Sequence, residues 1–382
     1  KGLEADGVIR LTSSVMYRNP VTEHGFYEKK TLSRAQQEIA DSILDSFDRG
    51  DMRTGLIHGI TGSGKTEVYL ELIAGMIQRG KQAIVLIPEI ALTYQTVQRF
   101  TGRFGSRVSV MNSTLSAGEK QDQCRRAQKG EIDVMIGPRS ALFVPFPNLG
   151  MILIDEEHET SYKSETSPKY HARETAEELA RLSGAMVVLG SATPSLEAYS
   201  RAESGQYRLF TLKERLTGGT LPEVEIADLR EELRQGNRSI FSRSLQEKLR
   251  QRLERKEQSM LFLNRRGYAG FVSCRSCGYV CKCPHCDVSL SEHRGGRLVC
   301  HYCGYEQQTV SVCPSCGSKY ILGFKAGTEQ IEEQIKKLFP GARVLRMDAD
   351  TTRTKESYEK ILSSFAKGEA DILVGTQMIV KG

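Results

Sequence analysis

The chain has 382 residues, of which 39% are hydrophobic and 26% are charged, and its formal net charge is +6. These values are ordinary for a soluble protein with about two domains, and no low-complexity tract is present. Because no run of 18 apolar residues occurs, a membrane-spanning helix is excluded and we expect no membrane partner. The net charge alone does not indicate whether the protein binds nucleic acid.

Between residue 54 and about residue 207, apolar β-type runs alternate with helical patterns. This alternation is typical of a parallel sheet with crossover helices, and we predict an α/β domain of the RecA-like kind. The residues before it, 1–30, contain an apolar alternation at 8–17 and little else that predicts structure.

The segment from Gly59 to Thr66 fits the phosphate-loop pattern G-x-x-x-x-G-K-[ST]. It follows an apolar run at 54–57 and precedes a helical pattern at 65–79, so it has the strand-loop-helix context that the pattern requires. Glycines let backbone amides surround a phosphate, Lys65 reaches the β and γ oxygens, and Thr66 offers its hydroxyl to Mg²⁺. We expect ATP and Mg²⁺ here, bound by Gly59, Thr61, Gly62, Ser63, Gly64, Lys65 and Thr66. A simple glycine turn before an amphipathic helix is the less favoured alternative.

A second motif, Asp155-Glu156-Glu157-His158, follows an apolar run at 149–154. Such a run is suited to a strand buried on both faces, so Asp155 should emerge at the carboxyl edge of the sheet, where ligands of α/β folds bind. We predict that Asp155 holds Mg²⁺ and that Glu156 orients the attacking water. A solvated acidic cluster would be the preferred interpretation without the phosphate loop.

Four more polar segments follow apolar β-type runs and should lie along the same kind of edge. They are residues 86–93, 137–143, 190–195 and 375–382. Their small residues, hydroxyls and amides can approach a sugar-phosphate strand closely.

A short loop from Ser161 to Arg173 mixes aromatic and cationic residues. Bases can stack on tyrosine faces while lysine and arginine neutralise phosphates, so this composition is suited to single-stranded DNA. The candidate residues are Tyr162, Lys163, Tyr170 and Arg173. A merely solvated loop is the alternative.

Eight of the ten cysteines form four C-x-x-C pairs. Disulfides are improbable in this context and thiolate coordination is favoured, so we predict two closed, structural Cys₄ zinc sites. The ligands are Cys274, Cys277, Cys283, Cys286, Cys300, Cys303, Cys313 and Cys316. The spacing of the four inner cysteines is roughly that of a zinc ribbon, which leaves the outer four for the second ion, but the pairing is not certain from spacing. We interpret Cys281 as a free thiol and Cys124 as a packing residue on a helix.

A second α/β series surrounds the cysteines. It comprises a helix at 242–255 and a strand at 259–263 before them, and a helix at 329–338, a strand at 343–347, a helix at 355–366 and a strand at 372–374 after them. The cysteine region is therefore predicted to be an insertion in a second motor domain.

The order of these motifs resembles superfamily 2 helicases. The Asp-Glu-Glu-His box, the segment Leu-Ile-Pro-Glu-Ile-Ala-Leu-Thr at 86–93 and the cysteine cluster together resemble the PriA family of replication-restart helicases over nearly the whole chain. This resemblance implies four parts: residues 1–30 as the tail of a winged-helix domain and linker, 31–235 as the first RecA-like domain, 236–271 with 319–382 as the second, and 272–318 as the zinc insertion. It also implies the nested cysteine pairing.

The resemblance further implies individual roles. Gln36 would contact adenine, Ser191 and Thr193 would couple the nucleotide site to the DNA track, and His158 would lie between these two sites. Contacts with DNA or a coupling role would fall to Arg139, Arg265, Arg266, Thr376 and Gln377. For His158, the alternative is a hydrogen-bonded histidine without a separate role. For Arg265 and Arg266, the alternative is a pair of surface cations at a strand end.

The activity that the resemblance implies is ATP-dependent 3′ to 5′ DNA helicase action at stalled or branched replication forks. Implied partners are single-stranded and forked DNA, single-stranded DNA-binding protein and the primosome or helicase-loading proteins, in a bacterial, cytoplasmic and nucleoid-associated setting. Both ends of the chain resemble cut sites, and the family's arginine-bearing sixth motif is missing. We therefore expect this chain alone to bind nucleotide but to hydrolyse it poorly.

Three other classes share part of this pattern. A DNA translocase that remodels protein–DNA complexes without separating strands shares every motor motif. A zinc-dependent scaffold that only senses nucleotide would lack hydrolysis, and an RNA helicase is disfavoured only by the resemblance.

Overall fold

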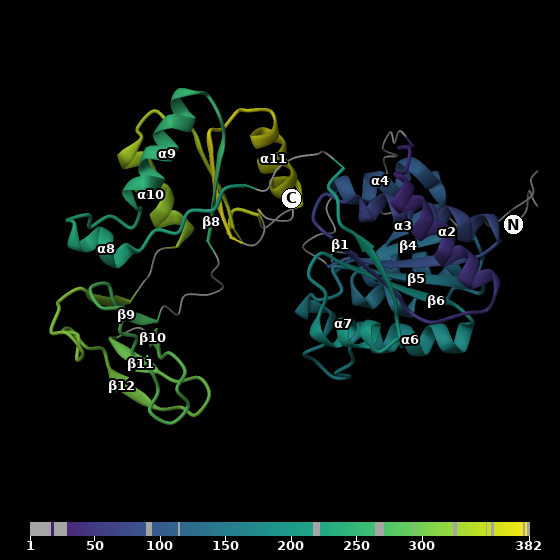
Figure 1. The fold of residues 1–382 in the computed structure, drawn as a ribbon, viewed down its shortest axis with the longest axis horizontal. Coiled ribbons are helices and arrows are strands. Elements are labelled where there is room, and N and C mark those ends of the chain that lie inside the picture. Colours follow the sequence, from purple (N-terminus) through teal and green to yellow (C-terminus); the bar gives the residue numbers. More distant parts are fainter. Residues whose placement is uncertain are drawn as a thin grey trace, which may run out of the picture. The chain divides into compact units, whose positions relative to one another are not determined.

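The computed structural model describes residues 17–18, 29–88, 94–113, 115–216, 222–263, 271–293, 295–323, 327–348, 350–352, 355–376 and 379. The chain divides into two compact units, Lys1–Thr220 and Leu221–Gly382 (Figure 1). Among the described helices, none has the length and apolar character that crossing a membrane requires.

The first unit is built on a sheet of seven parallel strands in the order β3-β4-β2-β5-β6-β1-β7. Because all neighbouring strands are parallel, they are joined by crossover connections rather than by hairpins. The strands are β1 (Gly55–Gly59), β2 (Gln82–Leu86), β3 (Val108–Val110), β4 (Val134–Gly137), β5 (Leu149–Asp155), β6 (Met186–Ser191) and β7 (Arg208–Leu212).

Helices cover both faces of this sheet, with α2, α3 and α4 on one side and α6 and α7 on the other (Figure 1). Strand residues alternate between two cores: Ile84 belongs to one and Val85 to the other. Burial on both faces explains why these strands are continuously apolar. The helices are α2 (Arg34–Asp48), α3 (Lys65–Gln78), α4 (Tyr94–Phe104), α5 (Ala117–Gln128), α6 (Ala172–Ser183) and α7 (Leu196–Glu203).

The strand register brings the predicted motifs to one edge. Asp155 pairs with Gly190 and Ile57 pairs with the same glycine from the other side, while Leu86 pairs with Gly137 and Ile154. The carboxyl ends of β1, β2, β4, β5 and β6 therefore lie level along the sheet.

The second unit has a parallel sheet in the order β14-β15-β8. Its strands and helices are α8 (Leu229–Arg234), α9 (Arg243–Glu254), β8 (Ser259–Phe262), α10 (Thr328–Leu338), β14 (Val344–Met347), α11 (Lys355–Ala366) and β15 (Ile372–Gly375). Leu249, Ile331, Ile335, Ile372 and Val374 form part of the core between α9, α10 and the sheet.

The cysteine region interrupts this second sheet in the sequence. Strand β8 precedes the cysteines and β14 and β15 follow them, yet the three pair in one sheet, so the region is an insertion. It contains an antiparallel pair of β9 (Val272–Cys274) with β13 (Ile321–Gly323), and an antiparallel sheet of β10 (Ser291–His293), β11 (Arg297–Val299) and β12 (Glu306–Gln308).

The predicted fold class is confirmed: a parallel α/β unit precedes a smaller one that carries the cysteine insertion. The division between units at 220/221 differs from the predicted boundary after residue 235. The reason is local, because Glu232 of α8 accepts hydrogen bonds from the side chain of Asn237 and the backbone of Arg243, which ties α8 to the start of α9. Apart from Tyr17, the apolar alternation predicted at 8–17 lies outside the described residues.

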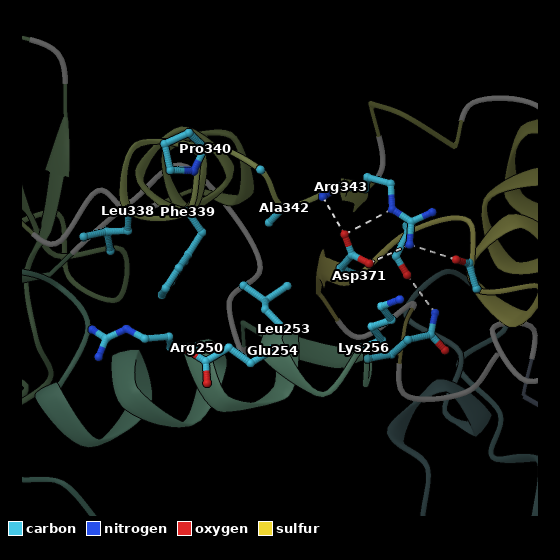
Figure 2. Close-up of a pocket in the computed structure, with 14 residues that line it drawn as sticks. Arg250, Leu253, Glu254, Lys256, Leu338, Phe339, Pro340, Ala342, Arg343 and Asp371 are labelled. Carbon is cyan, nitrogen blue, oxygen red and sulfur yellow. Dashed lines mark hydrogen bonds and ion pairs between the residues drawn. The ribbon is translucent and has the colours of Figure 1, made fainter.

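Figure 2 shows a hollow of about 850 Å³ in the second unit. Its wall comes from the ends of α9 and α10 and from Arg343 and Asp371, which pair with each other just before β14 and β15 begin. This is the amino edge of the sheet. Ligands of parallel sheets bind at the opposite edge, so this hollow is separate from the predicted motor motifs.

Candidate active site and zinc centres

The phosphate loop joins β1 to α3, as the sequence predicts. Gly62 and Gly64 have φ angles of 84° and 77°, in the region that side chains disfavour. Gly64 is the N-cap of α3 and provides no side-chain cap, so the first amides of the helix remain available to a ligand. Such a loop presents backbone donors and the positive end of the helix dipole to an anion.

The charged and polar groups of the loop fit a polyphosphate. The Nζ atom of Lys65 donates to the carbonyl oxygen of Gly59 at 2.8 Å. The hydroxyl of Ser63 is buried and has no partner among the described residues. A lysine bonded to its own loop and a buried hydroxyl without a partner among the described residues suit phosphate oxygens, and Thr66 follows Lys65 on the first helical turn.

Gln36 braces this loop from α2. Its Nε2 atom donates to the carbonyl oxygens of Ser63 and Gly64, at 3.0 and 3.3 Å, and its Oε1 atom accepts from the backbone of Ser33. The side chain is therefore engaged with the loop itself, and its predicted contact with adenine stays a prediction.

Asp155 lies at the end of β5 and is linked to the loop helix. Tyr69, one turn after Lys65 on α3, donates its hydroxyl to Oδ1 of Asp155 at 3.0 Å. Burial and the neighbouring Glu156 raise the pKa of Asp155 to about 6, while the Tyr69 bond and the charge of Lys65 oppose this rise. Lys65 and Asp155 thus lie at the same edge of the sheet, and their sharing of one Mg²⁺-nucleotide stays a prediction.

Two backbone features fix this junction. Glu156 has a φ of 47°, a costly conformation for a non-glycine residue that is often found at functional sites. Gly190 of β6 must lack a side chain, because a Cβ there would lie 1.7 Å from the hydroxyl of Tyr69. Sequence reasoning missed Tyr69, since a tyrosine one turn into a helix resembles an ordinary core residue.

Glu157 is the second residue that sequence reasoning left without a role. Its carboxylate accepts from the backbone and hydroxyl of Ser195, at 2.6 and 3.0 Å, and pairs with Arg173 at 3.2 Å. Both charged side chains are almost fully buried. This network joins the acidic motif, the segment after β6 and the start of α6.

His158 connects the same two motifs by another path. Its Nδ1 atom lies 2.8 Å from the hydroxyl of Ser191, which also accepts from the backbone of Thr193 at 2.9 Å. The structure therefore brings the three predicted coupling residues together, and their coupling role stays a prediction.

The loop from Ser161 to Arg173 needs two corrections. Tyr162 is 1% exposed and donates its hydroxyl to the backbone oxygen of Asp155, and Arg173 is 5% exposed. Neither side chain is presented as a surface for bases or phosphates, because tertiary contacts with the acidic motif bury both. They anchor the loop instead.

Other residues of this loop remain accessible. Lys163 is exposed, and half-buried Tyr170 packs edge-to-face on Phe143 with ring centroids 5.3 Å apart. Arg139 donates to the backbone oxygens of Ser161 and Lys163, at 2.7 and 2.8 Å, and so holds the loop, while its predicted contact with DNA stays a prediction.

The predicted residues of the second unit are only partly described. Arg265, Arg266 and Gln377 lie outside the described residues. Thr376 directly follows β15, and its backbone oxygen accepts from Ile379 at 3.0 Å.

The cysteines form two groups of four. One group comprises Cys274, Cys277, Cys313 and Cys316, and the other comprises Cys283, Cys286, Cys300 and Cys303. Sulfur atoms lie 3.7 Å apart for Cys274 and Cys316 and 3.5 Å apart for Cys283 and Cys303. Tetrahedral zinc with Zn–S bonds of about 2.3 Å separates its sulfurs by about 3.8 Å. The geometry fits zinc and the nested pairing.

Cys281 belongs to neither group in the described part of the chain. It is buried in the core of the insertion, where burial raises the pKa of its thiol. Cys124 lies on α5 and packs against the core of the first unit that contains Ile84. Both placements agree with the sequence interpretation.

Comparison with known proteins gives two matching families. Residues 29–196 match the family described as Type III restriction enzyme, res subunit, and residues 283–308 match the PriA DNA helicase Cys-rich region (CRR) domain. The second match covers the inner four cysteines.

Curated relatives match the chain along its length. Replication restart protein PriA of Bacillus subtilis is 51% identical over 100% of this chain and 48% of that protein. The proteins of the same name from Synechocystis sp. and Haemophilus influenzae are 48% and 41% identical over 92% and 93% of this chain, and over 43% and 48% of those proteins. The chain therefore spans about half the length of the curated relatives it matches.

Among solved structures, RecG bound to a three-way DNA junction is similar with 18% identity and a TM-score of 0.46. The match covers 91% of this chain and 36% of that chain, and the likeness is too weak to add to the argument.

The raised pKa of Asp155 makes a prediction for the chain without metal or nucleotide. Between its ordinary value of 3.8 and about 6, folded Asp155 keeps a proton that the unfolded chain has lost, so stability falls as pH rises through this window. Asp155→Asn keeps the acceptor for Tyr69 without the charge. We expect it to increase the free energy of unfolding above pH 6, by at most about 3 kcal/mol, with no gain below pH 4.

Denaturant unfolding followed by circular dichroism at several pH values measures this effect. Asp122→Asn is the control of opposite sign, because the hydrogen bond from Arg18 lowers the pKa of Asp122 and its stabilisation is present at high pH. An Asp155→Asn gain that does not change between pH 4 and 7 contradicts the assignment.

The zinc assignment predicts different metal contents for two neighbouring cysteine variants. Wild-type protein should hold two zinc ions per chain, Cys283→Ser about one, and Cys281→Ser two, because only Cys283 is a ligand. Atomic absorption on purified protein measures the metal. If Cys281→Ser loses zinc, or if Cys283→Ser keeps both ions, then the ligand role has been assigned to the wrong one of these two thiols.

Proposed function

Since this chain belongs to the PriA family of replication restart proteins and spans about half of their length, we propose that it forms the core of an ATP-driven DNA helicase. The helicase acts at stalled or branched replication forks. Hydrolysis in the first unit powers movement along single-stranded DNA, and the zinc insertion is a structural module of the second unit.

One observation supports this proposal above the others. The loop from Ser161 to Arg173, whose accessible part mixes lysine and tyrosine, is bonded directly to the acidic motif. Tyr162 holds the backbone of Asp155, and Arg173 pairs with Glu157. A strand of DNA that moves this loop therefore acts on the residues that face the nucleotide.

The residues of the site divide the chemistry between them. Lys65 and the amides of the phosphate loop would bind the triphosphate, and Thr66 and Asp155 would hold Mg²⁺. The metal, when bound, would supply positive charge to the reacting phosphate. Glu156 orients the attacking water and accepts its proton.

Contact with DNA falls to the accessible residues of the loop. Lys163 and Lys169 are exposed and can neutralise phosphates, while the pair of Tyr170 with Phe143 offers aromatic faces to bases. Arg139 keeps the loop in place through its two backbone contacts. His158 and Ser191 give a second path from the loop side to Thr193.

The zinc insertion is closed to chemistry, because all four positions at each ion would be thiolates. Arg275 ties it to its own unit by donating to the backbone oxygens of Arg238 and Ser239, both at 2.9 Å. Its role in this proposal is therefore structural.

The family resemblance supports four finer proposals. Movement is 3′ to 5′, and restart proceeds through primosome assembly. Single-stranded DNA-binding protein and helicase-loading proteins are partners, and the protein associates with the nucleoid. A translocase that remodels protein–DNA complexes without unwinding is distinguished by a forked duplex that releases its strand only if unwound.

The phosphate-loop assignment predicts the effect of Lys65→Ala in the full-length protein. Loss of the cation that holds the triphosphate should lower DNA-stimulated hydrolysis by at least about 100-fold. Binding of single-stranded DNA should change by less than about threefold, because Lys65 faces the loop interior. Phosphate release and fluorescence anisotropy measure the two. Loss of DNA binding together with hydrolysis would mean that the role of this loop is misassigned.

The anchoring of the loop predicts a second, more selective effect. Tyr162→Phe removes the hydrogen bond to the Asp155 backbone, so the ratio of DNA-stimulated to basal hydrolysis should fall at least about threefold. Tyr207→Phe is the matched control, since the Tyr207 hydroxyl bonds Glu177 and Arg201 away from this site. If the ratio is unchanged in Tyr162→Phe, the loop does not link DNA binding to ATP hydrolysis.

A further inference from the structure

The chain leaves the first sheet by passing over the phosphate loop. After β7 ends at Leu212, the backbone of Leu216 donates to the carbonyl oxygen of Gly62 at 3.1 Å, and Ile60 donates to Leu212 at 3.3 Å. Leu216 lies four residues before the division between the units. None of the sequence motifs includes this segment.

Leu216 places an apolar side chain beside the loop. A Cβ added to Gly64 would lie 2.5 Å from Cδ1 of Leu216 and 2.4 Å from Nε2 of Gln36. An apolar group and an amide thus converge on the same glycine. Leu216 is nevertheless 52% exposed, so its burial in the protein is incomplete. The amide of Gln36 is already bonded to the loop, so it is the exposed part of the Leu216 side chain that suits the apolar face of a nucleobase.

Arg215 brings an unsatisfied cation to the same loop. Its Cγ atom would lie 3.9 Å from a Cβ on Gly62, and its Nε atom is buried without a partner. Among the described residues, its guanidinium makes no hydrogen bond or ion pair. Arg208, on the strand β7 that precedes this segment, by contrast donates to the backbone oxygen and the hydroxyl of Ser42.

A buried guanidinium nitrogen without an acceptor is costly, and native structures rarely keep one without a purpose. The hydroxyl of Ser63, in the same loop, is unsatisfied as well. Phosphate oxygens are strong acceptors that match the charge and the planar donors of arginine. One polyphosphate at this loop would satisfy both groups.

We propose that Arg215 and Leu216 are nucleotide-binding residues: Arg215 donates to the polyphosphate and Leu216 packs against the base. This inference rests on the proposed ATP site at Lys65 and extends it to a segment outside the motor motifs. The nucleotide then also restrains the chain immediately before the second unit begins.

Equilibrium binding to the full-length protein tests the two contacts separately. The probes are a fluorescent ATP derivative, unlabelled ATP as competitor, and inorganic tripolyphosphate as a competitor without a base. Arg215→Ala should weaken ATP and tripolyphosphate alike by at least about tenfold, as expected for one charge-assisted bond. Leu216→Ala should weaken ATP about threefold to fivefold and leave tripolyphosphate unchanged.

Lys213→Ala is the matched control, because it removes an exposed charge from the same segment. Arg215→Lys retains the charge and should recover part of the affinity. The melting temperature of each variant without nucleotide should match wild type, as expected for ligand contacts.

Each other result overturns the inference. Wild-type affinities in Arg215→Ala exclude the arginine contact. A lowered melting temperature, with tripolyphosphate weakened in Leu216→Ala as well, means that the segment only braces the loop. Lys65→Ala serves as the reference variant. If it binds ATP like wild type, the nucleotide site itself is misplaced and the proposed function fails. If only the Arg215 variant binds ATP normally, the proposed function stands and this extension of the site is removed.

Discussion

The site depends on bringing a cation and a carboxylate together from distant parts of the chain. Lys65 begins α3 and Asp155 ends β5, and a parallel sheet sets both at its carboxyl edge with β6 between their strands. Tyr69 secures the arrangement, because its hydroxyl reaches Asp155 from α3 and occupies the space that a side chain on Gly190 would need. Three elements are thereby held together at the point where we propose that a Mg²⁺-nucleotide binds.

The sequence predicted the parts of this arrangement that depend on local rules. The phosphate loop, the strands before each motif and the four C-x-x-C pairs follow from residue spacing and apolar runs, and the structure has them at those positions. The nested grouping of these pairs was implied only by the family resemblance. It could not predict which loop residues are buried. Tyr162 and Arg173 have the composition of a DNA-binding surface, yet tertiary contacts with Asp155 and Glu157 turn both inward. Glu157 and Tyr69 were missed because their roles exist only through partners far away in sequence.

These inward-facing residues join the loop directly to the acidic motif. A buried ion pair such as Arg173 with Glu157 is costly to break, since either charge alone would be left desolvated. The loop and the acidic motif are therefore expected to move together. The zinc insertion has short strands and a small buried core that includes several of the cysteines. We therefore expect its two metal sites to add to its folding free energy.

The central claim is that Lys65 and Asp155 share one ligand, and a double-mutant cycle on Mg²⁺-ATP affinity tests it most directly. The cycle compares Lys65→Ala, Asp155→Asn and the double variant with wild type. Residues that hold one ligand together should be non-additive, with a coupling of about 1 kcal/mol or more. Effects that add to within about 0.5 kcal/mol would mean that the two residues act at separate places, and the motor interpretation would not stand.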